Sequence, residues 1–269
     1  MQPDNRDLAL ALRGGLRGRF QSSFHLLGNA LEVLDDQMVH CLNPVEYETL
    51  RPLLRQIEDQ LIALRRLGEH AADAAIAPVL QQASEPHPLE LLDHLREFCE
   101  LFNEIAVQSD FAASAQLQCP KEMTTLLTMG DTALLNGLLA NLFSNSLAVS
   151  RSVHITLACA PGLLCYRDDG PGLPPDAAAL LLDGIWSERL LEQGGLGLPL
   201  IRAYARAMEW GVETGEGPGL EIRFRLPACS IDLDNIVVES VPAAGDTRQR
   251  RRRYLQRELH LLTGADQTK

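Results

Sequence analysis

Two glycine-rich stretches constrain this chain more than any other feature of its sequence. An apolar run ends at Asp168 and is followed by Gly170 and Gly172. Further along, Gly195 and Gly197 stand directly before a segment with helical periodicity. Glycines permit a close approach of the backbone to a ligand, and the free N–H groups at a helix N-terminus favour phosphate. The two stretches together therefore predict a nucleotide site within one domain.

A third motif lies upstream, on a predicted helix over residues 132–149. Asn141 and Asn145 are four residues apart, so their side chains share one face of that helix. An apolar strand over residues 153–157 follows, and a Pro-Gly turn joins it to the strand that ends at Asp168. This order favours a binding role for the two amides over a place on a plain helix surface.

In that order the three motifs resemble the asparagine box and the two glycine boxes of the GHKL superfamily. This superfamily joins histidine kinases, the large heat-shock chaperone ATPases, DNA gyrase and the mismatch-repair ATPases. The matching segments are Asn141-x-x-x-Asn145, Asp168-x-Gly170-x-Gly172 and Gly195-Leu196-Gly197-Leu198. The resemblance covers roughly residues 85–228 and implies ATP and Mg²⁺ as cofactors.

The resemblance also assigns roles to single residues. Asp168 would accept a hydrogen bond from the exocyclic amine of adenine, and so select ATP over GTP. Its neighbour Asp169 is the competing candidate, and a plain Asp-Gly-Pro-Gly turn is the structural alternative. Asn145 would hold the Mg²⁺ that bridges the phosphates, with Asn141 as a supporting contact. Residues 173–194 would form a lid over the phosphates.

The N-terminal part predicts a long helical hairpin. Apolar residues step by three or four from about residue 7 to 38 and again from 50 to 68, and Asn43-Pro44 separates the two runs. Such a hairpin completes a four-helix bundle by pairing with a second copy, which predicts a homodimer. Packing of the hairpin on the C-terminal domain of its own chain is the alternative.

Within the first helix, His25 begins a His-x-x-x-Asn-x-Leu segment that looks like the phosphoacceptor segment of histidine kinases. The hairpin resembles their dimerisation and phosphotransfer domain, which makes His25 the candidate catalytic residue. Three positions depart from the family pattern. Leu26 stands where an acid usually follows the histidine, Ala148 replaces a basic residue, and Gln193 replaces the first glycine of the last box.

The predicted fold class is α+β. A helical hairpin over residues 1–72 and a linker over 73–86 precede a two-layer α/β sandwich with a mixed sheet, the Bergerat-type ATP-binding fold, over 87–228. An extension over 229–269 contains an arginine-rich run between residues 248 and 257. That run is either a solvated helix that pairs with the acidic body of the protein or a docking surface for an acidic partner.

Composition limits the remaining possibilities. A net charge of −12 argues against broad affinity for nucleic acid, so no nucleic-acid partner is expected. The six cysteines contain no Cys-x-x-Cys pair and lie mostly in apolar segments, so buried thiols are expected, with no zinc cluster. No apolar run long enough to span a bilayer was recognised, which predicts a cytoplasmic protein without a membrane segment.

Together these features predict a cytoplasmic histidine kinase core. It would bind Mg-ATP, phosphorylate His25 and pass the phosphoryl group to an aspartate of a response-regulator receiver domain. The alternative is a histidine phosphotransfer protein or pseudokinase with the same fold and weak or no ATP chemistry. A non-enzymatic regulator that pairs with another kinase through the hairpin is a third possibility.

Overall fold

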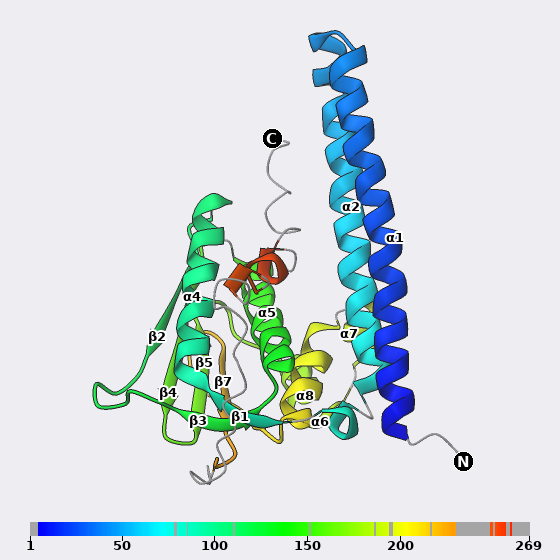
Figure 1. Cartoon of the computed structure of the whole chain (residues 1–269). Coiled ribbons are helices and arrows are strands. Elements are labelled where there is room, and N and C mark those ends of the chain that lie inside the picture. Colours follow the sequence, from blue (N-terminus) through cyan, green and yellow to red (C-terminus); the bar gives the residue numbers. More distant parts are fainter. Residues whose placement is uncertain are drawn as a thin grey trace.

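The computed structural model describes residues 5–77, 80–84, 86–109, 111–150, 152–185, 187–193, 196–215, 217–229, 248–249, 251–256 and 259. A tall helical hairpin stands beside an α/β domain and meets it at its base (Figure 1). This is the α+β architecture that the sequence predicts, with a mixed sheet and helices in two layers.

The hairpin consists of α1 (Asn5–Cys41) and α2 (Pro44–Ile76). Asn43 starts α2 because its Oδ1 accepts hydrogen bonds from the backbone N–H groups of Val45 and Glu46, at 3.1 and 3.0 Å. The Glu46 carboxylate accepts the Asn43 N–H in return, at 3.2 Å, which completes a capping box. Pro44 occupies the first helical turn, where its missing N–H costs nothing.

The segment expected to be a linker is partly helical. Helix α2 continues to Ile76, and residues 80–83 form the short helix α3 (Leu80–Ala83). Leu80 is fully buried in the core of the α/β domain. Asp73 is also buried, and its Oδ2 accepts a hydrogen bond of 2.5 Å from the hydroxyl of Tyr204. The base of the hairpin is therefore fastened to the α/β domain by both apolar and polar contacts.

The α/β domain contains a five-stranded sheet of order β2-β4-β5-β7-β6. Its strands are β2 (Ser114–Gln118), β4 (His154–Ala160), β5 (Leu163–Asp168), β6 (Gly211–Thr214) and β7 (Glu221–Arg225). Only β2 and β4 are parallel, so the sheet is mixed. A separate antiparallel pair joins β1 (His87–Glu90) to β3 (Leu127–Gly130). The sequence analysis did not foresee β1, whose Pro88 and charged Glu90 hide the strand pattern.

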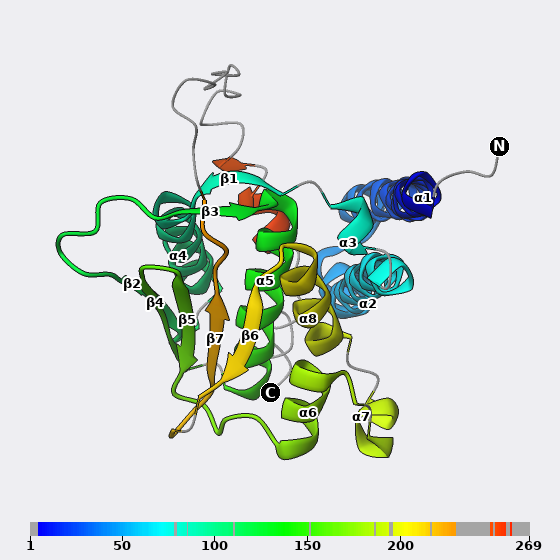
Figure 2. The same ribbon diagram turned by 90° about the horizontal axis from the view of Figure 1, so that it is seen from below.

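Three helices cover one face of the sheet, namely α4 (Leu91–Gln108), α5 (Thr132–Val149) and α8 (Gly197–Ala207) (Figure 2). Edge-to-face contacts join Phe98 and Phe102 of α4 to Phe143 of α5, and Phe143 to Tyr166 of β5. These aromatic pairs lock α5 onto the end of β5. The lid region holds α6 (Pro175–Asp183) and α7 (Glu188–Gln193).

Helix α5 corrects one expectation from the sequence. It is long and apolar enough to cross a membrane by length and composition, although no such run was recognised. Two thirds of it, 67%, is buried inside the α/β domain, as expected for a core helix. Its apolar character is therefore explained by packing against both neighbouring helices and the sheet.

The thiols are less uniformly buried than predicted. Cys99, Cys159 and Cys165 are buried, whereas Cys41 and Cys119 are exposed. Burial raises the pKa of the Cys99 and Cys159 thiols to about 12, so both stay protonated and behave as small apolar side chains.

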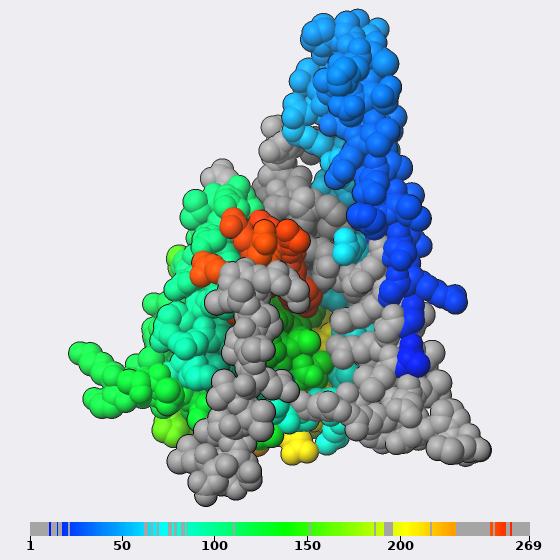
Figure 3. Space-filling view, viewed as in Figure 1, coloured from blue at the N-terminus to red at the C-terminus, as the bar shows by residue number. Residues whose placement is uncertain are grey.

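The arginine-rich run packs on the body of its own chain where the structure describes it. Arg251 is buried and bonds Glu97, and Arg248 bonds Glu100 and Glu104, at 3.2 and 2.6 Å. Figure 3 shows these C-terminal helical residues against the green surface of the α/β domain. This favours pairing with the acidic body over a surface left free for a partner. Arg250 and Arg257 lie outside the described residues.

Arg251 also reaches His94, whose Nδ1 lies 3.1 Å from the arginine Nη2. Because a guanidinium can only donate, His94 accepts at Nδ1 and donates from Nε2 to Asn136 Oδ1, at 3.0 Å. Burial, and then the charge of Arg251, lower the pKa of His94 to about 3. The histidine is therefore neutral in the folded protein at neutral pH.

This depressed pKa predicts a loss of stability in acid. The unfolded chain binds a proton at His94 below about pH 6.5, whereas the folded chain does not until about pH 3. The contribution is complete above pH 6.5 and is lost as the pH falls, at about 1.4 kcal/mol per pH unit. Between about pH 6.5 and 4.5 the wild type should lose about 3 kcal/mol of unfolding free energy through this group. We expect His94→Gln to show a smaller decrease over the same pH range when unfolded with urea. His40→Gln, exposed on α1, is the control, and equal pH profiles for wild type and His94→Gln would contradict the assignment.

Candidate functional site

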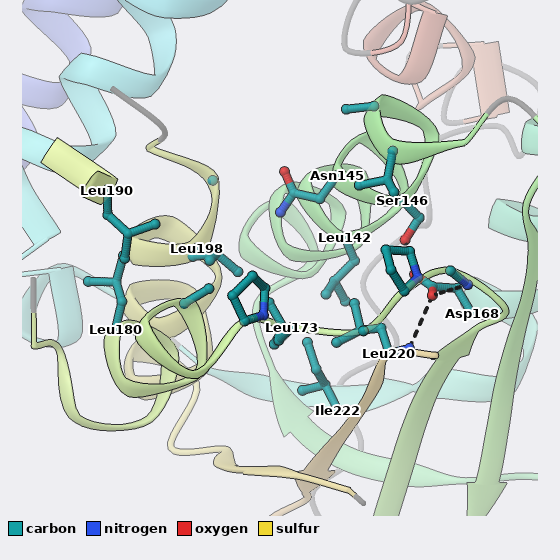
Figure 4. A pocket seen from close by; sticks show the side chains of 18 of the residues that line it. Leu142, Asn145, Ser146, Asp168, Leu173, Leu180, Leu190, Leu198, Leu220 and Ile222 are labelled. Carbon is teal, nitrogen blue, oxygen red and sulfur yellow. Dashed lines mark hydrogen bonds between the residues drawn. The ribbon is translucent and has the colours of Figure 1, made fainter. Parts of the chain in front are cut away.

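One pocket gathers most of the motif residues. It lies between α5, the end of β5 and the lid, and has a volume of about 320 Å³. Of the predicted site residues, Asn145, Asp168, Gly170, Gly172, Gly197 and Leu198 line it. Figure 4 shows Asn145, Ser146 and Asp168 on one side of the pocket, with Leu180, Leu190 and Leu198 on the other. Motifs more than fifty residues apart in sequence thus converge on one cavity.

Asp168 is the most firmly held polar group of the pocket. It is 8% exposed, and its Oδ1 accepts hydrogen bonds from the backbone N–H groups of Gly170 and Leu220, at 2.9 and 3.2 Å. Its Oδ2 accepts from the hydroxyl of Ser146. A carboxylate offers about four lone-pair positions, so one position on Oδ2 remains for a ligand. A hydrogen-bond donor that enters the pocket can therefore bind this carboxylate without displacing a protein contact.

Ser146 is itself fixed from behind by Tyr166. The two hydroxyls lie 2.7 Å apart, the Ser146 hydroxyl donates to Asp168, and the Tyr166 hydroxyl also donates to the Leu142 carbonyl oxygen at 3.3 Å. Burial raises the pKa of Tyr166 well above its usual range, which keeps this phenol protonated and able to donate. The strand end and α5 are thus joined by a chain of three polar side chains under the pocket.

The neighbouring carboxylate has a different role. Oδ1 of Asp169 accepts the backbone N–H of His154 at 2.8 Å, at the start of β4. Asp169 does not line the pocket. The geometry therefore favours Asp168 over Asp169 as the residue that meets a ligand.

A glycine outside the predicted motifs shapes the pocket floor. Gly219 has φ of +86°, and a Cβ placed on it would lie 2.1 Å from the carbonyl oxygen of Asp168. Gly172 has φ of +81° and would collide with the Gly219 carbonyl in the same way, at 3.0 Å. Both residues must lack a side chain for the two loops to meet and for Leu220 to donate to Asp168.

The two predicted amides occupy different places. Asn145 is half-buried and lines the pocket, whereas Asn141 is buried behind it and does not. Nδ2 of Asn141 donates to the Gly137 carbonyl at 2.8 Å, and its Oδ1 is buried without a hydrogen-bond partner among the described residues. Oxygens of both amides lie beside Gly197, 3.0 and 3.3 Å from where a Cβ would stand. A hard cation favours such amide oxygens, so this corner fits Mg²⁺ held by Asn145, with Asn141 behind it.

The N-terminus of α8 faces the same pocket. Gly197 is its first residue, and the preceding Leu196 provides no side-chain cap. The first N–H groups of this helix are therefore available to an anion. Leu196 does not line the pocket but packs partly against the core. Gly195 lies outside the described residues.

Arg189 is a site residue that the sequence analysis missed. It lies on α7, lines the pocket, and is the one cationic residue among the described lining residues. Its guanidinium lies 4.0 Å from the Asp176 carboxylate and is 58% exposed. Arg189 could have been recognised from the sequence as a basic residue within the predicted lid. Ser146, directly after Asn145, and Gly219, in a Gly-Pro-Gly turn, could also have been recognised.

His25 lies far from these residues in sequence, on α1 of the hairpin, and is exposed. Its Nε2 is 3.4 Å from Nδ2 of Asn29, one turn later. An amide nitrogen can only donate, so this contact uses the tautomer in which Nε2 carries the lone pair and Nδ1 the proton. The structure does not bring His25 into the pocket.

Comparison with known proteins identifies a family match over the region that contains the pocket. Residues 130–230 match the family model described as histidine kinase-, DNA gyrase B- and HSP90-like ATPase. No curated protein matches the chain by sequence. Among solved structures, full-length ShkA in complex with AMPPNP aligns with a TM-score of 0.51 at 18% identity, and covers 78% of this chain and 45% of its own.

Two further structures align less closely. Histidine kinase AdeS of Acinetobacter baumannii has a TM-score of 0.47 at 16% identity and covers 74% of this chain and 93% of its own. Histidine kinase ThkA in complex with response regulator protein TrrA has a TM-score of 0.47 at 18% identity. The alignment covers 83% of this chain and 64% of the ThkA chain.

Residues 130–230 thus match the ATP-binding domain of the histidine kinase, gyrase B and HSP90-like ATPase family, which confirms the resemblance carried by the asparagine and glycine boxes. The fold is the one expected for the catalytic domain of a histidine kinase.

The Asp168 geometry predicts the effect of a one-atom change. In Asp168→Asn an amide NH₂ replaces Oδ2, so a donor would face the donor of an adenine amine. We expect Mg-ATP to raise the melting temperature of wild type by mass action and to leave that of Asp168→Asn unchanged. Asp169→Asn is the matched control, because its remaining oxygen can still accept the His154 N–H. An ATP-dependent shift in Asp168→Asn equal to that of wild type would contradict this role.

Proposed function

We propose that this protein is the core of a histidine kinase that binds Mg-ATP, phosphorylates His25 and transfers the phosphoryl group to an aspartate of a response regulator. The observation that carries the proposal is the convergence of Asp168, Asn145 and the α8 N-terminus on one pocket of an ATPase-family domain. The exposed His25 on the adjoining hairpin supplies an acceptor.

The pocket has distinct regions for the parts of ATP. Apolar side chains, among them Leu142, Leu173 and Ile222, provide the walls against which a purine ring can pack. Asp168 accepts from the adenine amine at its remaining lone pair. The phosphates extend toward Gly197, where the N–H groups of α8 and the charge of Arg189 favour anions.

Magnesium fits the corner beside Gly197. Asn145 would hold it, because a hard cation takes oxygen ligands and Mg²⁺ commonly combines one or two protein oxygens with phosphates and water. When bound, the ion would neutralise charge on the phosphates during transfer. Arg189 supplies a further positive charge on the lid side, which offsets the absence of a basic residue at Ala148.

His25 acts as the nucleophile in this scheme. The lone pair of Nε2 attacks the γ-phosphorus, the bond between that phosphorus and the bridging oxygen breaks, and ADP leaves with the electron pair. The proton on Nδ1 stays on the ring, and Asn29 helps to select this tautomer. Because His25 does not line the pocket of its own chain, transfer requires either motion of the α/β domain relative to the hairpin or the pocket of the second copy in the dimer.

One observation favours the second candidate, a histidine phosphotransfer protein or pseudokinase. Leu26 is 69% exposed beside His25 and can neither orient the Nδ1 proton nor stabilise developing positive charge. A general base typically contributes about 10²–10⁴ in rate. Slow phosphorylation with intact ATP binding would therefore agree with the degenerate motif.

The hairpin surface supports a homodimer. An apolar groove with a cavity volume of about 290 Å³ runs along it, lined by Leu27, Ala30, Leu31, Ile57, Gln60, Leu61 and Leu64. Ile57 is 52% exposed there, and the described part of the α/β domain lies beside the base of the hairpin (Figure 1). A second hairpin would cover this groove and complete a four-helix bundle. A cytoplasmic location is part of the same proposal.

Radiolabelling tests the kinase activity. We expect γ-labelled ATP to label wild type slowly with acid-labile, alkali-stable phosphate, because phosphohistidine has this stability and phosphoserine does not. His25→Ala abolishes the label, and Leu26→Glu increases its rate by restoring an acid. Asp168→Asn, which keeps His25, is the control for dependence on the pocket. Label that persists in His25→Ala would exclude this histidine as the acceptor, and no label in any variant would favour the pseudokinase.

Light scattering tests the dimer. We expect wild type to be a dimer and Leu31→Asp or Ile57→Asp to be monomeric, because a buried unpaired carboxylate costs several kcal/mol. Val45→Asp is the matched control, since Val45 is exposed near the turn of the hairpin and does not line the groove. A monomeric wild type, or a dimer that survives both groove substitutions, would contradict the proposal.

A further inference from the structure

A second cavity opens on the other side of the lid helix α6. It lies between α8, the C-terminal end of α6 and the base of the hairpin with α3, a junction that is visible in Figure 2. Its volume is about 460 Å³, which is within the range of small-molecule sites. Its polar lining residues are Gln81 of α3 and two arginines of α8, Arg202 and Arg206.

The guanidinium of Arg202 is incompletely bonded. Its Nη1 is buried and has no hydrogen-bond partner in the described part of the chain. The group packs against Gly184, which ends α6 with φ of +75° and whose Cβ would stand only 3.2 Å from the arginine Cζ. A buried donor nitrogen without a partner is costly, and no acceptor among the described residues meets this one.

Arg206 adds a second charge to the same cavity. It lies one helical turn after Arg202 on α8, so both side chains project from one face. Burial, and then the charge of Arg206, lower the pKa of Arg202, although Asp183 at the end of α6 acts in the opposite direction. Within the described ranges neither arginine forms an ion pair, whereas Arg167, Arg223 and Arg225 of the sheet are each paired with a glutamate.

We propose that this cavity binds a phosphate group between Arg202 and Arg206. A phosphate dianion matches two guanidinium charges that form no ion pair within the described residues, and its oxygens can accept from both planar forks at once. The amide of Gln81 provides a further donor at the edge of the cavity. The cavity volume leaves room for a small organic group attached to the phosphate, so the source is either free phosphate or a small phosphorylated metabolite.

The proposed phosphate site is separate from the nucleotide pocket. Among the described lining residues, Leu180 of α6 is the one shared by both cavities, so this helix is their common wall. Asp168, Asn145 and Gly197 line the nucleotide pocket alone. A ligand between the two arginines would therefore contact the back of the lid without touching the residues assigned to ATP.

Calorimetry and thermal unfolding test the site with inorganic phosphate as the probe, in a buffer of constant ionic strength that contains saturating ADP. We expect saturable binding and a higher melting temperature for wild type. Arg206→Gln and Arg202→Gln should each weaken phosphate binding about tenfold or more, because each removes a charge-assisted hydrogen bond. Arg96→Gln removes an exposed charge on α4, outside both cavities, and should bind phosphate as wild type does.

A second ligand distinguishes free phosphate from a phosphorylated metabolite as the natural occupant of the site. Glucose 6-phosphate that binds more tightly than inorganic phosphate would indicate a phosphorylated metabolite, whereas equal affinity would indicate free phosphate. Arg206 is the less enclosed of the two arginines, so Arg206→Gln tests the site even if Arg202→Gln does not fold. Absence of saturable binding at millimolar phosphate, or equal affinity in wild type and Arg206→Gln, would overturn the proposal. Neither result depends on kinase activity.

Discussion

The hydrogen bonds around the Asp168 carboxylate are the constraint on which the rest of the pocket depends. They join three separate parts of the chain, because Ser146 comes from α5, Gly170 from the loop after β5 and Leu220 from the turn directly before β7. A partly buried carboxylate is tolerated because these donors replace the water that it loses. The same donors fix its orientation and leave one lone pair directed to the cavity.

Backbone packing around this carboxylate depends on two glycines with positive φ. Gly172 and Gly219 approach so closely that a methyl group on either would contact a main-chain carbonyl oxygen. The lid loop and the turn before β7 can therefore meet only at these residues. Edge-to-face aromatic rings from α4 to β5 support the arrangement from the core, so that the polar side chains from Tyr166 to Asp168 rest on a close-packed apolar base.

Helix α6 of the predicted lid lies between the two cavities. One side faces the residues assigned to ATP, and the other faces two arginines near the base of the hairpin. The Asp73 and Tyr204 contact lies at the same base and ties α2 to α8. Helix α8 thus connects the N-terminus that faces the candidate nucleotide pocket, the arginine pair and the base of the hairpin within three turns.

The sequence by itself determined the hairpin, the Asn and Gly motifs, the extent of α5 and the ATPase-family resemblance, because these rest on local spacing and on residue types with few conformational alternatives. It also singled out Asp168, although the choice over Asp169 rested on spacing to Gly170 and Gly172. Only the tertiary structure decided that Asp169 bonds His154, that Asn141 stands behind Asn145, and that Leu220 donates to Asp168. The His154 and Leu220 contacts join residues 15 and 52 positions apart in sequence, through backbone N–H groups that carry no residue-specific signal. The burial of Asn141 depends on how α5 packs. The sequence also left open whether the arginine-rich run is free or paired. The tertiary structure decides this for Arg248 and Arg251, because it places them beside Glu104 and Glu97 of α4.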